Sequence, residues 1–196
     1  MGDDVMRTGI FYATREGQTE KIARFVSESF LKLGFETVVT NLGDKTNAAK
    51  IDLGSYDAVV LAASVHAGKH ESEIVRFVKT HLLELDSMPA AFLSVTLSEA
   101  GVERPTATDE ERARFKADVQ KMLDAFYEES GWRPRRVKPV AGALLYTHYN
   151  FLVRFIMKQI ARKAGAETDT SHDYEYTDWH ELDRFVTQFV TEISAR

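Results

Sequence analysis

The sequence predicts an α/β fold in which helices cover both faces of a doubly wound, five-stranded parallel sheet. Five short runs of apolar or β-branched residues alternate with segments whose apolar residues recur at helical spacing. Some of these runs are almost continuously apolar, which is typical of strands buried on both faces of a parallel sheet. The length of 196 residues suits one domain with a sizeable core. We therefore expect a single domain over residues 6–196, with residues 1–5 as added residues.

The first half of the chain holds three of the predicted strands. Thr8–Ala13 is the first, and it leads into a helix that Gly34 ends. Phe35–Asn41 is rich in β-branched residues and forms the second strand. Ala58–Ser64 has the sequence AVVLAAS and forms the third. The apolar face of the first helix carries Ile22, Val26, Phe30 and Leu33.

The second half continues the alternation of helices and strands. A helix follows the third strand, with Ile74, Phe77, Val78, Leu82 and Leu85 at helical spacing. Ala90–Val95 is the fourth strand, and Val137–Ala143 is the fifth. Thr108 and Glu111 have the spacing of a capping box, which predicts the start of a long helix that ends near Gly131. A C-terminal helix carries the apolar stripe Leu182, Phe185, Val186, Phe189, Val190 and Ile193.

Composition restricts the chemistry that the chain can perform. The sequence has no cysteine, which excludes disulfides, thiolate metal sites and a cysteine nucleophile. Redox chemistry would therefore need a bound cofactor. The net charge is −5, but residues 130–166 contain no carboxylate and carry +8, so the remainder carries −13. The eight cations are Arg133, Arg135, Arg136, Lys138, Arg154, Lys158, Arg162 and Lys163. This distribution favours a localised anionic partner over general nucleic-acid binding.

A polar loop joins the first strand to the first helix, in the stretch IFYATREGQTEKIA over residues 10–23. Unpaired backbone N–H groups and the helix dipole favour a phosphate at such a helix start. The loop matches neither the GxGxxG pattern of dinucleotide-binding sites nor the GxxxxGK[ST] pattern of nucleoside triphosphate-binding sites. It fits a monophosphate such as that of FMN, with Thr14, Gln18 and Thr19 as side-chain donors and Arg15 either paired with the phosphate or in solvent. The alternative is that these polar residues serve only to cap the turn.

Several motifs together resemble one family. The loop ATREGQT (13–19) resembles the phosphate loop of the flavodoxin-like superfamily. The further blocks are ASVHAGKH (63–70), DSMPAAFLSV (86–95), SGWRP (130–134), VAGALLY (140–146), FIMKQI (155–160), and GAETDT through YTDW (165–179). These blocks, in order over nearly the whole chain, are similar to the flavodoxin-type, quinone-dependent protoporphyrinogen oxidases of bacteria. The resemblance implies the strand order 2-1-3-4-5.

The resemblance also implies a set of FMN-binding residues. The phosphate would be held by Thr14, Arg15, Glu16, Gly17, Gln18 and Thr19. The isoalloxazine would be flanked by Ser64, Val65, His66, Ala67, Gly68, Ser94, Val95 and Thr96. Flavodoxins often place an aromatic residue against the ring, but this chain has none in the loop over residues 96–108. His66 and His70 are either proton carriers near the flavin or polar residues of a solvated loop.

Residues 144–176 form an insertion before the last helix. Within residues 144–163, Arg154, Lys158 and Arg162 recur at i, i+4 and i+8 and share one helical face. This pattern predicts a basic amphipathic helix, which either lies at a lipid surface or packs on the sheet with its cations in water. We expect Arg133, Arg135, Arg136, Arg154, Lys158 and Arg162 to be candidates for contact with substrate propionates or lipid headgroups.

The resemblance implies an enzyme of haem biosynthesis. It would oxidise protoporphyrinogen IX to protoporphyrin IX and pass the electrons to menaquinone or ubiquinone. The implied location is cytoplasmic, with peripheral attachment to the anionic inner face of the membrane, and a homo-oligomer is possible. We expect no metal and no nucleic acid as partners. The alternatives are an FMN electron carrier, which the acidic remainder of the chain would suit, and an NAD(P)H-quinone reductase on the same fold.

Overall fold

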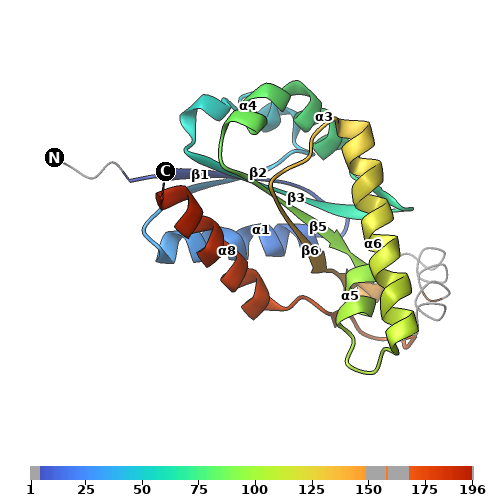
Figure 1. The fold of residues 1–196 in the computed structure, drawn as a ribbon. Helices are drawn as coiled ribbons and strands as arrows, with labels where there is room; N and C mark the ends of the chain where they lie inside the picture. The colour runs from blue at the N-terminus through green and yellow to red at the C-terminus, as the bar shows by residue number, and fades with distance from the viewer. Residues whose placement is uncertain (1–4, 149–157, 159–167, 196) are drawn as a thin grey trace.

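A computed structural model of the chain describes residues 5–148, 158 and 168–195 (Figure 1). Its main sheet has five parallel strands in the order β2-β1-β3-β5-β6, and the short strand β4 pairs with β3 in antiparallel orientation. With β4 set aside, this is the order 2-1-3-4-5, so the predicted fold class is confirmed. The strands are β1 (Arg7–Ala13), β2 (Glu36–Asn41), β3 (Ala58–His66), β4 (Lys69–His70), β5 (Ala90–Thr96) and β6 (Arg136–Ala141).

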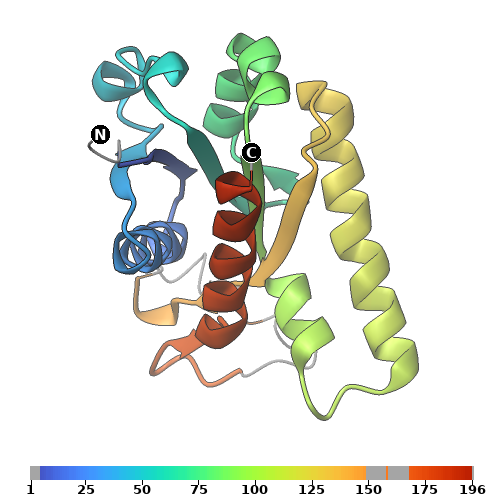
Figure 2. The ribbon, with the colours of Figure 1, turned by 60° about the vertical axis from the view of Figure 1, so that its left-hand side comes forward.

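Helices pack on both faces of the sheet (Figures 1 and 2). They are α1 (Gln18–Lys32), α3 (Ser72–Thr80), α4 (Leu82–Ser87), α6 (Asp109–Ser130) and α8 (Trp179–Ser194). The helices α1 and α8 share one core cluster with the sheet, and α3, α4 and α6 share the other. Successive strand residues serve opposite faces, so Ile10 belongs to the first cluster and Phe11 to the second. The central strands are therefore buried on both sides, as their apolar sequences predict.

Local signals set the helix boundaries. Gly17, with φ of 96°, precedes α1, and Gly34, with φ of 87°, follows it; both angles lie in the left-handed region that favours glycine. The predicted capping box is present at the start of α6. The Glu111 N–H donates to the Thr108 hydroxyl at 3.2 Å, and the Thr108 N–H donates to the Glu111 carboxylate at 2.9 Å. Gly131 ends α6 with φ of 79°.

Two helical regions differ from the sequence prediction. The helix expected through residues 74–85 is two helices, α3 and α4, because the backbone leaves the helical region at His81, with φ of −114° and ψ of 25°. The segment 96–108, which we expected to be a loop, contains the helix α5 (Leu97–Glu103). Thr96 caps α5, since its hydroxyl accepts a hydrogen bond from the Ser98 N–H at 3.2 Å.

Short elements fill the remaining connections. They are α2 (Lys45–Ala48), the 3-10 helix η1 (Leu53–Ser55), β7 (Ala143–Leu144), the 3-10 helix η2 (Tyr146–His148) and β8 (Tyr174–Glu175). Ala143, expected as the end of the fifth strand, instead begins β7. Because β7 and β8 pair in antiparallel orientation, the two ends of the 144–176 insertion lie side by side. Most of the expected amphipathic helix lies outside the described residues, and no helix within them is long and apolar enough to cross a membrane.

The strand β6 forms one edge of the main sheet, and α8 is fastened to it by ion pairs. Arg136 on β6 pairs with Glu192 near the end of α8. The Lys138 ammonium lies 3.5 Å from the carboxylate of Glu181, near the start of α8. Pro139 follows Lys138 on this edge strand, and edge strands are among the few places in sheets where proline occurs.

Candidate functional site

A cavity of about 280 Å³ lies at the carboxyl edge of the sheet, where β1, β3 and β5 end. In an open α/β sheet this edge is where ligands bind. The lining residues come from five parts of the chain: Thr14, Glu16, Gln18 and Thr19; Ser64–Gly68; Val95, Thr96, Leu97 and Ser98; Met122; and Gly142, Ala143 and Leu145. Most of the residues that the resemblance assigned to FMN therefore meet at one cavity, and Arg15, Gly17 and Ser94 are not part of its lining.

The loop before α1 is arranged as an anion site. The Gly17 N–H donates to the Thr14 hydroxyl oxygen at 3.0 Å, and none of the side chains that the structure describes caps the first turn of α1. The hydroxyl of Thr19 is fully buried and has no hydrogen-bond partner within the described part of the chain. Buried hydroxyls are rarely left without a partner, so this group fits a ligand oxygen. The donor set of the loop therefore matches an FMN phosphate.

Gln18 lines the cavity, but the hydrogen bonds of its side-chain amide go to other residues. Its side-chain amide donates to Glu175 and to Thr177, each at 2.9 Å. The Thr177 hydroxyl donates in turn to the Ala141 carbonyl at 2.7 Å, and Lys21 forms an ion pair with Glu175 at 2.7 Å. The side chain of Gln18 thus fastens α1 to the segment around β8 instead of donating into the cavity.

Arg15 does not line the cavity; its side chain is 54% exposed, as in the solvent-facing alternative, and it also pairs with two carboxylates. Its Nε lies 2.6 Å from the carboxylate of Glu71, and its terminal nitrogen lies 3.4 Å from Glu73. Glu71 is only 4% exposed and also accepts a hydrogen bond from the Ser64 hydroxyl at 3.1 Å. Burial alone would raise the pKa of Glu71, but hydrogen bonds and charge from His66 and Arg15 outweigh burial and hold that pKa below its usual value.

His66 lies between two carboxylates. Its Nε2 is 2.9 Å from both oxygens of Glu16 in the phosphate loop, and its Nδ1 is 2.7 Å from Glu71. The hydrogen bonds with Glu16 and then with Glu71 raise the pKa of His66 to about 9. His66 therefore carries a positive charge at neutral pH, inside the predicted flavin cavity.

His70 behaves in the opposite way. Its ring packs against those of Phe92 and Phe126, which stack on each other at 4.3 Å. The two phenyl centroids lie 5.2 and 5.0 Å from the His70 ring, and the His70 Nε2 is 2.8 Å from the Ser94 hydroxyl. Burial lowers the pKa of His70 to about 4. Because His70 and Ser94 are 7% and 1% exposed, they support the floor of the site and do not reach the cavity.

Aliphatic and sulfur-containing side chains form much of the cavity wall, including Val65, Val95, Leu97, Met122 and Leu145. Sequence reasoning missed the last three. The Thr96 hydroxyl contacts the Met122 sulfur at 3.7 Å, which places a residue of α6 beside the end of β5. The position of Met122 at the cavity depends on how α6 packs on the sheet, which local sequence patterns do not show. None of the described lining residues is aromatic.

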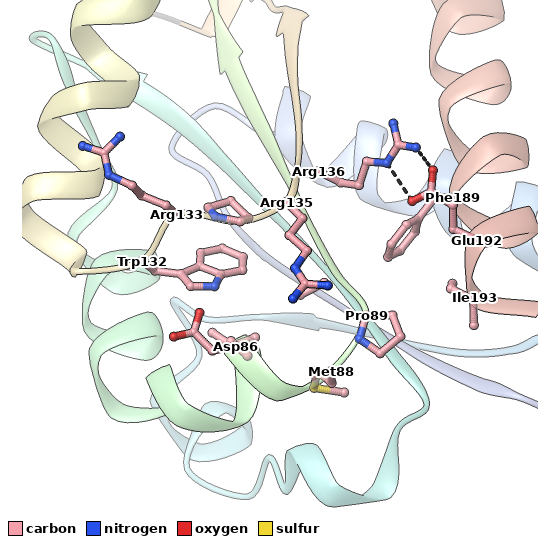
Figure 3. A pocket seen from close by; sticks show the side chains of 13 residues that line it. Asp86, Met88, Pro89, Trp132, Arg133, Arg135, Arg136, Phe189, Glu192 and Ile193 are labelled. Carbon is pink, nitrogen blue, oxygen red and sulfur yellow. Dashed lines mark hydrogen bonds and ion pairs between the residues drawn. The ribbon is translucent and has the colours of Figure 1, made fainter. Parts of the chain in front are cut away.

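The predicted cationic candidates do not gather at this cavity. Arg133, Arg135 and Arg136 lie at the opposite, amino edge of the sheet, around a second cavity of about 310 Å³ (Figure 3). Arg133 lies over the Tyr127 ring at 4.9 Å, and Arg135 and Trp132 both line this cavity. Lys158 is exposed, whereas Arg154 and Arg162 lie outside the described residues.

Helix geometry explains why arginines gather at the amino edge. In this fold the helices run antiparallel to the strands, so α4, α6 and α8 end there. A helix C-terminus carries partial negative charge, and cations nearby are stabilising. The three arginines therefore have a structural explanation that needs no ligand.

Comparisons with known proteins agree with this geometry. A family model described as a flavodoxin domain matches residues 9–171. The chain is 36% identical over 183 residues to protoporphyrinogen IX dehydrogenase (quinone) of Escherichia coli strain K12, a match that covers 93% of this chain and 94% of that one. It is 33% identical over 181 residues to the protein of the same name from Leishmania major, covering 92% of this chain and 73% of that one.

Solved structures agree on the fold. A short-chain flavodoxin associated with a non-canonical PDU bacterial microcompartment has a TM-score of 0.51 at 15% identity, covering 96% of this chain and 99% of that one. Oxidised flavodoxin 2 from Bacillus cereus has a TM-score of 0.50 at 13% identity, covering 95% and 99%. The chain therefore belongs to the flavodoxin family, and within that family it is similar to the quinone-dependent protoporphyrinogen IX dehydrogenases.

Proposed function

We propose that this protein is an FMN-dependent oxidoreductase that oxidises protoporphyrinogen IX to protoporphyrin IX and passes the electrons to menaquinone or ubiquinone, in haem biosynthesis. The observation that supports the cofactor is the buried hydroxyl of Thr19 at the start of α1, which has no hydrogen-bond partner among residues 5–148 and 168–195 and lines the cavity at the carboxyl edge of the sheet. A phosphate there would give this hydroxyl a partner. The substrate is supported by 36% identity with the E. coli dehydrogenase over 93% of the chain.

The residues of the cavity suit the parts of such a cofactor. Thr14, Thr19 and the free N–H groups of the first turn of α1 would hold the phosphate. Val65, Val95 and Met122 would exclude water from the ring. Bound FMN would supply the redox chemistry, since it accepts two electrons at a time. Protoporphyrinogen loses six electrons and six protons on becoming the porphyrin, so three quinones are reduced to three quinols for each substrate.

An anaerobic assay tests the proposed activity. FMN-loaded protein is mixed with protoporphyrinogen and a menaquinone analogue, and porphyrin fluorescence is followed, with no-enzyme, no-quinone and flavin-free controls. We expect porphyrin formation that requires both the quinone and the FMN-loaded protein. If correctly folded, FMN-loaded protein forms no porphyrin, the proposed dehydrogenase activity is refuted.

An electron carrier is the second candidate, and the −13 charge outside residues 130–166 favours it. Acidic faces guide association with basic redox partners. A carrier would exchange electrons with a partner protein and leave protoporphyrinogen unchanged.

Bleaching of the flavin by NAD(P)H under the same anaerobic conditions would instead identify a quinone reductase.

We further propose that the protein attaches peripherally to anionic membranes through Arg154, Lys158 and Arg162. Support comes from their shared helical spacing in a segment without carboxylates, and from the exposure of Lys158. Replacing all three by Glu should abolish binding to vesicles that contain phosphatidylglycerol and leave FMN binding intact. A control with the same charge change reverses the exposed residues Lys32, Lys45 and Lys50. Equal vesicle binding by the two variants would refute the proposal.

A further inference from the structure

The phosphate loop has little positive charge of its own to offer an anion. Its one arginine, Arg15, is turned away and held by Glu71 and Glu73. Its carboxylate, Glu16, lines the cavity, where it would oppose a phosphate. To bind a phosphate, this loop needs a positive partner for the Glu16 carboxylate or a Glu16 side chain that turns away from the cavity. His66 supplies the partner.

The geometry at His66 fixes its protonation state. Both of its ring nitrogens lie within 2.9 Å of carboxylate oxygens, from Glu16 on one side and Glu71 on the other. An ionised carboxylate only accepts hydrogen bonds, so both nitrogens must donate, and the ring must be an imidazolium. Glu71 is well placed for this role, because it is buried and held by Ser64 and Arg15.

We propose that His66, as an imidazolium, is a positioning residue that clamps the phosphate loop to the start of α3 through Glu16 and Glu71, and so prepares the loop for the FMN phosphate. The inference rests on the proposed flavin site and adds the residue that holds that site in its binding form. His66 lies on the hairpin that joins β3 to β4, with Ala67 and Gly68 at the turn, both with positive φ. A two-residue turn of this kind fixes the position of the ring more firmly than a long loop would.

The clamp makes FMN binding depend on pH. The charged groups that face His66 are Glu16 from the loop, Glu71 from the start of α3 and, across its own hairpin, Lys69. With the pKa of His66 raised to about 9, the clamp is fully formed at pH 7 and is lost as the pH rises through about 9. Glu16 is then left beside the phosphate without its counter-charge.

Binding of two ligands to two variants tests the clamp. FMN and riboflavin affinities are measured by flavin fluorescence from pH 7 to pH 10 for the wild type, His66→Gln and His81→Gln. The control replaces a second histidine that lies beside a glutamate, since the Nδ1 of His81 is 3.3 Å from Glu84, at the far end of α3. Riboflavin lacks the phosphate, so it separates an effect on the loop from an effect on the ring.

At pH 7 we expect His66→Gln to weaken FMN binding by about tenfold, the scale of one charge-assisted contact, and to weaken riboflavin binding much less. At pH 10 the difference between this variant and the wild type should disappear. Equal FMN affinity of the wild type and His66→Gln at pH 7 would overturn the clamp, and so would an equal loss of riboflavin affinity. Thermal melts of each variant confirm that it is folded.

A second measurement needs no flavin. Nitrogen-15 NMR of the His66 ring in the flavin-free protein reports its two protons directly, and we expect both at pH 7 and a titration near pH 9. A ring with one proton at pH 7 refutes the clamp. If the wild type binds no FMN and the ring still carries both protons, the proposed function fails and the ionic link between the loop and α3 is nevertheless present.

Discussion

At the scale of single residues, two histidines on one hairpin have opposite electrostatic environments. His66 faces two carboxylates, whereas His70 packs against the stacked rings of Phe92 and Phe126. Sequence reasoning selected both as possible proton carriers because imidazole titrates near neutral pH. Spacing along the sequence could not separate them, since the difference depends on Glu16 from another loop and on aromatic rings from β5 and α6. The loop before α1 could be selected from sequence as a candidate phosphate site, but the contacts of Arg15 and Gln18 could not be predicted, because their partners lie far along the chain.

Acid should destabilise the protein through His70. Its pKa is about 4 in the folded state and near 6.5 when unfolded, so the unfolded chain binds the extra proton between these values. Stability therefore falls as the pH drops from about 6.5 towards 4, by up to ~3 kcal/mol for this one group. His70→Gln should be less stable at pH 7 and show a flatter acid limb in urea unfolding. The control is His180→Gln, at an exposed histidine. If the free energy of unfolding falls as steeply below pH 6.5 in His70→Gln as in this control, His70 is not the group responsible.

At the scale of elements, the sequence predicted long, regular segments well and short ones poorly. The five parallel strands and the capping box of α6 follow from apolar runs and from the Thr108–Glu111 pair. The helix α5 was missed because it has only seven residues, one of them Gly101, and too few apolar positions to show a period. The hairpin of β3 and β4 was missed because β4 has only two residues.

Gly101 should be essential for the packing of α5 on α6. A Cβ atom at this position would lie 2.6 Å from a ring carbon of Phe115, which is 4% exposed and held in the core. Gly101→Ala should therefore lower the free energy of unfolding by about 1–3 kcal/mol, although alanine normally favours a helix. Because α5 begins with Leu97 and Ser98 of the cavity wall, FMN affinity should fall as well.

Urea unfolding and FMN titration of this variant provide the check. Gly43→Ala is the comparison, since the nearest contact of its added Cβ is the end of the Asn41 side chain at 3.0 Å, near the protein surface. A Gly101→Ala protein as stable as the wild type would show that α5 can shift away from α6 without cost.

At the scale of the whole molecule, the two edges of the sheet have separate roles. The carboxyl edge holds the cavity with the phosphate loop, and the amino edge holds the arginines and the ends of α4, α6 and α8. The fold class, and with it the location of the ligand edge, was predictable from the alternation of strands and helices. The position of Arg133, Arg135 and Arg136 at the amino edge could not be predicted. The charge count groups all cations of residues 130–166 together, but β6 runs from the amino edge to the carboxyl edge within this segment and so separates them.

Reversing the charge of Arg135 should therefore leave the flavin site unaffected. The six residues of β6 separate the two edges by roughly 20 Å, about twice the Debye length at 0.1 M salt. Arg135→Glu should keep FMN affinity and the KM for protoporphyrinogen within about twofold of wild-type values, since surface charges at that range are screened. Flavin titration and steady-state kinetics measure both. A fivefold change in either value would place Arg135 in contact with the reaction.

The edge strand β6 has a consequence for self-association. An unpaired strand edge is a template on which a second chain can add a strand and begin to aggregate. Here Pro139 offers no N–H to such a strand, and the ion pairs of Arg136 and Lys138 hold α8 alongside the same edge. A homodimer formed by continuing the sheet across β6 is thereby disfavoured. Pairing of two copies would have to use another surface, such as the helices, the loops or the opposite edge strand β2, and the folded chain should resist fibril formation at the β6 edge even when it is concentrated.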